Sequence, residues 1–284
     1  MTSAAVAGWL RRLLRCQKIG HTGTLDPDVA GVLPICVGKA SRLAEYLTAQ
    51  GKAYRAELTL GVTTTTQDAA GEVIARKEPR LNRADLEAIL PQFVGEIQQI
   101  PPMFSAIRQS GRRLYEYARA GLEVERPART VTVHSINVVG WQEGRCPRAL
   151  LDVECSKGTY IRTLCHDIGQ ALGCGGHMSY LLRTRSGPFD LSTSWTLEEI
   201  ETAQAAGDAS FLLPPSSGLD LPVVTLPAER AKAFCHGLST GTSRIPGAVA
   251  NEGQFVQVRD GENLLGIGVW REQQLYPHKV LHGS

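Results

Sequence analysis

The first stretch with a clear pattern of apolar and polar positions lies near the N-terminus. Apolar residues recur there at helical spacing, at Val6, Leu10, Leu13 and Leu14. Arginines occupy the opposite side of the same turns, as they do in an amphipathic surface helix. The pattern therefore predicts that the chain opens with a helix.

Two later stretches combine a helical pattern with a capping signal. Asn82 stands three residues before Asp85, in the arrangement of a capping box, and Pro91 should kink or end the helix that follows. Thr196 and Glu199 repeat this arrangement and predict a second helix. In the helix that follows Asn82, apolar residues recur at i, i+3, i+4 and i+7, at Leu86, Ile89, Leu90 and Phe93.

Other segments alternate between apolar and polar residues, as half-buried strands do. The clearest is 53–61, whose apolar face carries Tyr54, Ala56, Leu58 and Leu60. On the residues alone, Tyr54 is a core tyrosine whose hydroxyl finds a partner. Further strands are predicted at 131–139, 149–155, 255–259 and 264–270, the last two joined by a turn at Asp260 and Gly261.

A helix that Thr159 is predicted to cap carries two cations at its start. Lys157 and Arg162 lie where the helix macrodipole disfavours cations by about 0.3–1 kcal/mol each, which suggests that they meet an anion. That anion is either a phosphate or the carboxylate of Asp26. The alternative is a solvated lysine and an arginine that lies along the first turn. The core stripe of this helix is Ile161, Leu164, Cys165, Ile168 and Leu172.

Composition is that of an ordinary globular protein. The 284 residues are 43% hydrophobic and 20% charged, and this length suggests about two domains. No apolar run is long enough to span a membrane, and the N-terminus lacks the apolar stretch of a signal peptide, so we expect a cytoplasmic protein. Seven cysteines and seven histidines form neither a C-x-x-C nor an H-E-x-x-H pattern, and no nucleotide fingerprint is present. We therefore expect mostly buried thiols, no metal site and no cofactor.

Positive charge is concentrated locally, although the net charge is only +2. Such runs are usually solvated faces, but beside a glycine-rich loop they fit a footprint for nucleic-acid phosphates. The first 55 residues hold eight cations against Asp26, Asp28 and Glu45: Arg11, Arg12, Arg15, Lys18, Lys39, Arg42, Lys52 and Arg55. The second run is Arg108, Arg112, Arg113 and Arg119.

The segment from Gly20 to Pro34 is the strongest candidate for chemistry. Its three glycines and two prolines argue against a plain helix or strand. Because Asp26 precedes Pro27, its backbone is pushed toward an extended conformation. We expect a stiff loop that holds one carboxylate, Asp26, and one imidazole, His21. The alternative is a solvated Asp-Pro turn.

The same loop opens an ordered series of short motifs. Together they resemble the signature of TruB-type tRNA pseudouridine synthases over roughly residues 2 to 190, with a weaker match beyond. The motifs are Gly20-His21-Thr22-Gly23-Thr24-Leu25-Asp26-Pro27, Gly31-Val32-Leu33-Pro34, Gly38-Lys39-Ala40, Lys52-Ala53-Tyr54-Arg55, Ile100-Pro101-Pro102-Met103-Phe104-Ser105-Ala106, Gly111-Arg112-Arg113-Leu114-Tyr115-Glu116-Tyr117-Ala118-Arg119 and Cys155-Ser156-Lys157-Gly158-Thr159-Tyr160-Ile161-Arg162.

The resemblance implies an α+β fold with a mixed, largely antiparallel central sheet flanked by helices. It also implies a small C-terminal β-rich domain similar to PUA-like RNA-binding domains. Pro214 to Gly218 reads as a linker. We therefore expect a catalytic domain at 1–213, a linker at 214–222 and a PUA-like domain at 223–284.

By resemblance, Asp26 is the catalytic aspartate and Arg162 is the arginine that pairs with it. A cation beside a carboxylate keeps it ionised and oriented for nucleophilic attack, at either C6 of the base or C1′ of the sugar. The resemblance further implies four substrate-binding residues. Tyr54 stacks on the flipped uracil, His21 helps to extract the nucleotide, and Tyr160 and Leu181 line the pocket.

The implied substrate is the uridine at position 55 in the T-loop of tRNA, held through the T-arm by a monomeric enzyme. Splayed loop bases suit protein recognition better than duplex RNA does. Two other classes stay open on the residues alone. One is a non-catalytic tRNA-binding or RNA-chaperone protein. The other is a carboxylate hydrolase of nucleosides or sugars, which needs a second carboxylate that Asp28, so near Asp26 in the chain, does not clearly supply.

The start of the chain departs from the family pattern. Members begin with a strand ending in an Asp-Lys-Pro-x-Gly-Met-Thr-Ser-like segment, whereas this sequence begins at Met1-Thr2-Ser3. We interpret this as a misassigned start that omits the first strand, and the alternative is a truncated member of the family.

Overall fold

A seven-stranded sheet forms the centre of one of the two compact units of the chain. The computed structural model describes residues 1–105 and 107–281. One unit comprises Met1–Pro27, Leu33–Ala49 and Thr193–Ser284, and the other comprises Asp28–Val32 and Gln50–Ser192. Ala106, which ends the motif that begins at Ile100, and the last three residues of the predicted C-terminal domain lie outside the described residues.

The sheet of the second unit runs in the order β13-β12-β4-β11-β10-β7, with β2 beside β12. Its neighbouring strands pair antiparallel except for β2 and β12, which are parallel. The prediction of a mixed, largely antiparallel central sheet is therefore confirmed. The strands are β2 (Ala30–Gly31), β4 (Lys52–Leu60), β7 (Gly95–Gln99), β10 (Arg129–Gln142), β11 (Arg148–Cys155), β12 (Gly176–Ser186) and β13 (Phe189–Asp190).

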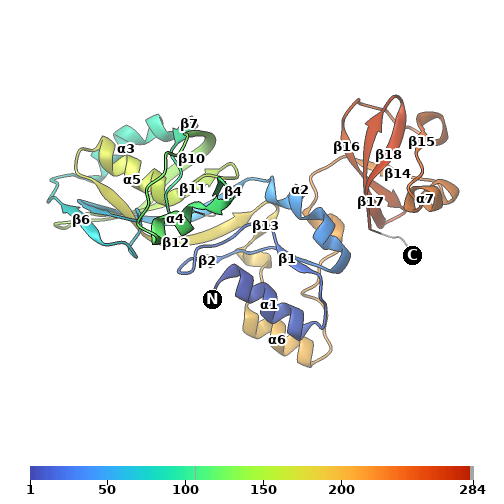
Figure 1. The fold of residues 1–284 in the computed structure, drawn as a ribbon, viewed down its shortest axis with the longest axis horizontal. Coiled ribbons are helices and arrows are strands. Elements are labelled where there is room, and N and C mark those ends of the chain that lie inside the picture. Colours follow the sequence, from blue (N-terminus) through green and yellow to red (C-terminus); the bar gives the residue numbers. More distant parts are fainter. Residues whose placement is uncertain (106, 282–284) are drawn as a thin grey trace. The chain divides into compact units, whose positions relative to one another are not determined.

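Strand β4 follows the predicted alternation. Ala56, Leu58 and Leu60 are completely buried, and Tyr54 on the same face is half-buried. Two helical segments, α3 (Arg83–Ile89) with η2 (Leu90–Phe93) and α5 (Ile161–Ala171), contribute to the same core, and Figure 1 shows α3 and α5 beside the sheet. The capping box at Asn82 is present, and the α-helix ends just before Pro91 as predicted.

The predicted cap of α5 is wrong. The N-cap is Tyr160, and its side chain makes no capping hydrogen bond. Thr159 instead donates from its hydroxyl to the Ser156 carbonyl, 3.0 Å away, because Gly158 turns the chain with a positive φ of 84°. The apolar stripe of α5 is confirmed, with Leu164, Cys165 and Ile168 at most 1% exposed.

The remaining strands of this unit form two small hairpins. β5 (Val62–Thr64) pairs with β6 (Val73–Arg76), and β8 (Arg108–Gln109) pairs with β9 (Arg112–Arg113). The second hairpin leads into α4 (Leu114–Arg119). The basic run predicted from the sequence therefore occupies one hairpin and helix, where Arg108, Arg112, Arg113 and Arg119 are all exposed.

In the other unit, α1 (Ser3–Leu13) packs with α6 (Leu197–Ala205), and Figure 1 shows the two helices side by side. Both are predicted helices, and the capping box at Thr196 and Glu199 is present. This part also contains β1 (Ile19–His21), β3 (Ile35–Val37), η1 (Gly38–Leu43) and α2 (Ala44–Thr48). Ala7, Leu10 and Ile19 form the buried centre of the cluster between them.

A five-stranded sheet in the order β14-β16-β17-β18-β15 forms the C-terminal part of the same unit. The predicted hairpin of β16 and β17 is confirmed. Sequence reasoning missed β14, α7, β15 and β18. In β18, Pro277 lies beside an irregularity in the pairing with β17, which is where a sheet tolerates proline. These elements are β14 (Val223–Thr225), α7 (Ala228–Cys235), β15 (Thr240–Gly241), η5 (Thr242–Arg244), β16 (Phe255–Asp260), β17 (Asn263–Arg271) and β18 (Gln274–Val280).

The segment predicted as a linker has structure of its own. Pro215–Gly218 forms a 3-10 helix, η4, and η3 (Leu191–Thr193) lies earlier in the chain. Leu219 and Leu221 pack near Phe255, and their carbonyls accept hydrogen bonds from the Gln257 amide. The domain boundaries at 213 and 222 stay a prediction.

All seven cysteines are free thiols, and four of them are buried, as predicted. Across the described residues, no helix is both long and apolar enough to cross a membrane.

Candidate active site

The loop that carries Asp26 is closed at its base by a short antiparallel pair of strands. β1 and β3 align Gly20 with Cys36, so Gly20 and His21 lie in a short strand, while the segment as a whole forms no plain helix or strand, as predicted. Glycine removes a side chain but keeps its backbone donor and acceptor, so it can still pair. Just beyond β1, the backbone N–H of Thr22 donates to the Pro34 carbonyl at 3.1 Å, and Thr22 is only 1% exposed.

Ser3 holds the residue that precedes Asp26. Its hydroxyl accepts a hydrogen bond from the backbone N–H of Leu25 at 2.8 Å and donates to the Leu25 carbonyl at 3.2 Å. Ser3 lies in the first turn of α1 and is only 3% exposed, so this contact is shielded from water. Asp26 itself is exposed. Helix α1 therefore fixes the backbone at the point where the carboxylate emerges.

The segment after the loop is held by strand β12. β2 pairs in parallel with β12, which places Gly31 opposite Arg183. A side chain at Gly31 would put its Cβ 2.2 Å from the Arg183 carbonyl oxygen, and its φ of 116° also favours glycine. Glycine here permits the close approach of two backbones, which the motif did not reveal by itself.

Tyr54 lies on β4 directly opposite Arg183 of β12. Tyr54 acts to raise the pKa of Arg183, against the larger lowering that burial causes. The ring is half-buried and packs against completely buried neighbours, in keeping with the interpretation of Tyr54 as a tyrosine at the core. Its role in stacking on a base stays a prediction.

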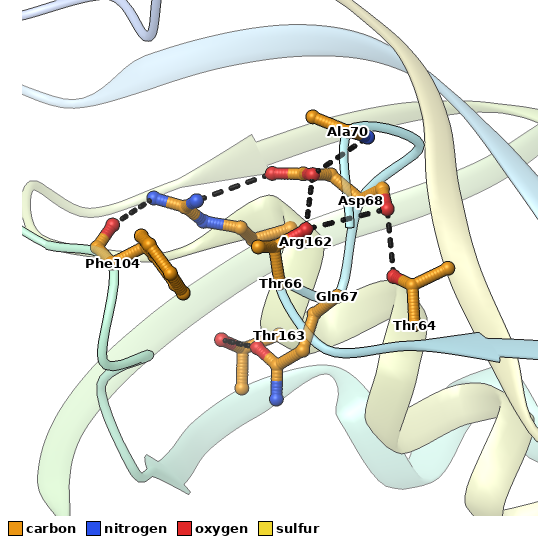
Figure 2. A network of polar contacts seen from close by, with 8 residues as sticks. All are labelled: Thr64, Thr66, Gln67, Asp68, Ala70, Phe104, Arg162 and Thr163. Carbon is orange, nitrogen blue, oxygen red and sulfur yellow. Dashed lines mark hydrogen bonds and ion pairs between the residues drawn. The ribbon is translucent and has the colours of Figure 1, made fainter. Parts of the chain in front are cut away.

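Arg162 occupies the first turn of α5 and is 6% exposed. Its Nη1 lies 3.2 Å from Oδ2 of Asp68, and its Nη2 donates to the Phe104 carbonyl at 2.8 Å (Figure 2). The cation at this helix start therefore does meet an anion, and Asp68 is a carboxylate that the sequence analysis did not consider. Lys157, the second cation, is exposed.

Asp68 is itself fixed by a network within its own turn, drawn in Figure 2. Its Oδ1 accepts hydrogen bonds from the Thr66 hydroxyl at 2.5 Å and from the Ala70 N–H at 3.1 Å. The neighbouring Gln67 has a positive φ of 65°, a strained conformation for a residue with a side chain. Two contacts stabilise it, one from the Met178 N–H to its carbonyl and one from the Thr163 hydroxyl to its amide oxygen.

Tyr160 and Leu181 belong to the same unit as Arg162. The Arg162 guanidinium carbon lies 5.9 Å from the centroid of the Tyr160 ring, so the structure brings these two predicted residues together. The buried Gln99 binds both the N–H and the C=O of Tyr160 through its side-chain amide. Leu181 lies on β12 opposite Ala56 of β4, and it is 9% exposed, within the core cluster.

His21 and Asp26 belong to the other unit, where His21 is half-buried at the end of β1. Sequence reasoning missed Ser3, Asp68, Gln99 and Arg183. Two of these had a signal in the sequence. Asp68 lies two residues after a run of four threonines, and Arg183 directly follows the apolar pair Leu181-Leu182. Within residues 1–105 and 107–281, no group of three or more His, Cys, Asp or Glu side chains could hold a metal ion.

Comparison with known proteins agrees with the resemblance. Residues 11–161 match the TruB family pseudouridylate synthase N-terminal domain, and residues 162–231 match the tRNA pseudouridylate synthase B C-terminal domain. A protein named tRNA pseudouridine synthase B from Moorella thermoacetica is 49% identical over 99% of this chain and 95% of its own length. Another of the same name from Symbiobacterium thermophilum is 53% identical over 84% of this chain and 79% of its own.

Solved structures show the same fold. A chain from a crystal structure of a Cbf5-Nop10-Gar1 complex is 29% identical, with a TM-score of 0.76 over 100% of this chain and 82% of that one. A chain from an H/ACA RNP bound to a substrate RNA containing 2′-deoxyuridine is 28% identical, with a TM-score of 0.75 over 99% and 82%. The fold and sequence thus define a pseudouridine synthase. The chain belongs to the TruB family of pseudouridylate synthases.

Proposed function

We propose that this chain isomerises a uridine of tRNA to pseudouridine, at position 55 in the T-loop. The observation that carries the proposal is the match of nearly the whole chain to proteins named tRNA pseudouridine synthase B. The motif that contains Asp26 lies within the matched N-terminal domain, as does Tyr54.

The reaction breaks the bond from uracil N1 to ribose C1′ and forms a bond from C5 to C1′. The proton on C5 leaves and N1 gains one, so the product is an isomer and no group donor is required. Asp26 acts as the nucleophile, at C6 or at C1′, because a carboxylate can form a covalent intermediate when it is held and ionised. The contact between Ser3 and Leu25 supports this role, since it limits the orientations open to the next residue.

Arg162 acts as the cation that keeps the Asp26 carboxylate ionised and oriented. Its planar guanidinium suits this role because it can bind carboxylates through two parallel hydrogen bonds. Its bonds to Asp68 and to the Phe104 carbonyl support the assignment, because a guanidinium held at two points keeps one orientation.

Four residues bind the nucleotide. Tyr54 stacks on the flipped base, Tyr160 and Leu181 line its pocket, and His21 takes part in extracting it from the T-loop. An aromatic face is a suitable partner for any extruded base. The half-buried rings of Tyr54 and Tyr160 are consistent with this assignment.

The protein works as a cytoplasmic monomer on the T-arm. It consists of a catalytic domain at 1–213, a linker at 214–222 and a PUA-like RNA-binding domain at 223–284. The exposed arginines of the β8–β9 hairpin and α4 support a phosphate contact, because phosphate neutralisation supplies most of the affinity of a protein for RNA backbone.

The test incubates the purified protein with an unmodified tRNA transcript and maps pseudouridine by carbodiimide treatment and primer extension. We expect one stop, at the T-loop uridine, and none in a transcript that carries cytidine there. Asp26→Asn should abolish the stop while tRNA affinity stays within about threefold, since the carboxylate serves chemistry and not backbone binding. Wild-type turnover by Asp26→Asn contradicts the assignment of Asp26.

A parallel measurement of free uracil separates the other classes. A nucleoside hydrolase releases uracil, and a non-catalytic RNA-binding protein yields neither uracil nor pseudouridine. Either result contradicts the proposed isomerisation.

A further inference from the structure

Arg183 is the largest charged side chain that the described part of the chain buries almost completely, at 1% exposure. Burying a charge is costly unless hydrogen bonds compensate, so the partners of its guanidinium have to be accounted for. Burial lowers the pKa of Arg183, and the nearby Tyr54 acts in the opposite direction. Two of the neighbours of Arg183 belong to different segments of the chain.

The first segment is the one that follows the Asp26 loop. The backbone N–H of Val32 donates to the Arg183 carbonyl at 2.8 Å, and the Arg183 Nε donates to the Val32 carbonyl at 2.7 Å. Val32 is 3% exposed, and Gly31 beside it leaves no room for a side chain against Arg183. One residue of β12 thus holds this segment by both its backbone and its side chain.

The second neighbour is Tyr54, which lies opposite Arg183 across the paired strands and counteracts the effect of burial on the pKa of the same guanidinium. This proximity follows from the strand register that pairs β4 with β12. A guanidinium is planar, and a bond at Nε fixes the directions of its remaining N–H donors. The contact with Val32 therefore determines where Arg183 can hold the Tyr54 hydroxyl.

We propose that Arg183 is a positioning residue that ties the end of the Asp26 loop and the Tyr54 hydroxyl to one point of strand β12. The inference rests on the proposed function, because Asp26 and Tyr54 matter only if the chain forms pseudouridine. Arg183 needs no contact with the RNA for this role. Its loss should slow the chemical step and leave tRNA binding almost unchanged.

The test compares Arg183→Met, Arg183→Lys and Arg185→Met. Arg185 is the matched control, an arginine on the same strand whose partner, Glu154, forms a partly exposed pair with it at 3.2 Å. We expect Arg183→Met to lower the single-turnover rate by about tenfold or more, as misplacement of catalytic groups does. Its tRNA Kd should stay within about threefold, and Arg185→Met should match wild type in both. Arg183→Lys should recover only part of the rate, because the lysine ammonium lacks the fork, the planar set of N–H donors of a guanidinium.

A folded Arg183→Met protein with the wild-type rate overturns the inference. An equal loss in Arg185→Met, or a loss confined to Kd, does so as well. If Arg183→Met does not fold, Arg183→Lys is measured in its place, and a full wild-type rate in that variant overturns the role of the fork.

A double-mutant cycle with Tyr54→Phe tests the link to the hydroxyl. If Arg183 acts on Tyr54, the shift in Tm caused by the Arg183 substitution is smaller in the Tyr54→Phe background than in wild type. Equal shifts in the two backgrounds contradict the link. Because this cycle needs no turnover, it decides the point even if wild-type protein forms no pseudouridine, in which case only the proposed function has failed.

Discussion

The guanidinium of Arg162 forms an ion pair with the Asp68 carboxylate across 94 residues of chain, with Nη1 and Oδ2 3.2 Å apart. Their side chains are 7% and 18% exposed, so water screens the pair weakly. Asp68 in turn depends on the Thr66 hydroxyl and the Ala70 N–H for its orientation. The position of a predicted catalytic arginine thus rests on a turn elsewhere in the chain.

Asp68→Asn should lower both stability and turnover. It removes the charge and keeps the shape, which leaves a buried guanidinium with less compensation, and we expect a loss of about 3 kcal/mol. Arg162→Lys should be a poor substitute because it cannot reach Asp68 and the Phe104 carbonyl together. Urea unfolding and single-turnover pseudouridine formation measure the two effects.

Asp152→Asn is the matched control for that prediction. Asp152 binds Arg55 through two hydrogen bonds of 2.7 Å, but the pair is exposed, with side chains 37% and 44% accessible. Exposed pairs contribute about 0–1 kcal/mol, so this variant should fold and turn over almost as wild type does. Equal losses in Asp68→Asn and Asp152→Asn contradict the special role of the buried pair.

Substitutions at Tyr54 should separate ring stacking from hydrogen bonding. Tyr54→Phe keeps the ring and should keep tRNA affinity, whereas Tyr54→Ala should lose about 1–3 kcal/mol of binding, the range for one stacked base. Equilibrium tRNA binding measures both. If Tyr54→Ala binds tRNA as tightly as wild type, Tyr54 does not stack on the base.

Ser3→Ala should slow turnover more than its loss of stability explains. It leaves the backbone N–H of Leu25 without the Ser3 hydroxyl, at a cost of about 1–3 kcal/mol, and it loosens the residue before Asp26. Thr2→Ala is the control, since it removes the N-cap of the same helix, worth about 1 kcal/mol, without touching Leu25. Single-turnover rates, measured well below the Tm of both variants, should fall for Ser3→Ala only. Similar rates for both variants reject the role of Ser3.

The affinity for tRNA should fall steeply as salt rises, because each neutralised phosphate releases counterions. Arg112, exposed on the β8–β9 hairpin, is a candidate for one such contact. Arg112→Gln should therefore reduce the slope of log K against log salt by about one. Binding titrations over a range of salt measure this, and an unchanged slope excludes Arg112 from the phosphate contacts.

EDTA should leave turnover of a prefolded tRNA unchanged. The isomerisation transfers no electrons to or from a cofactor and needs no group donor. Its chemistry therefore requires neither a redox-active metal nor a metal-bound phosphate that EDTA could disrupt. Pseudouridine formation with and without EDTA is the measurement. A rate restored only by added divalent ion contradicts the expectation.

Local pattern was enough to predict several elements. The stripe of Val6, Leu10, Leu13 and Leu14 became α1, and the alternation from 53 to 61 became β4, because period and burial are properties of neighbouring residues. The capping boxes at Asn82 and Thr196 likewise form within four residues of chain. The predicted cap at Thr159 is wrong because Gly158 turns the chain there, and the N–H of Tyr160 donates to the side chain of distant Gln99.

The motifs around Asp26, Tyr54 and Arg162 were also legible in the sequence alone, and they were sufficient to identify the family. What surrounds these residues was decided only by tertiary structure. Asp68 reaches Arg162 across 94 residues, and Arg183 binds Val32 across 151. The second contact depends on strand register, and β12 shifts register twice, between Met178 and Tyr180 and between Arg183 and Arg185. Each shift changes which residues face their neighbours, and a pattern of apolar and polar positions does not encode it.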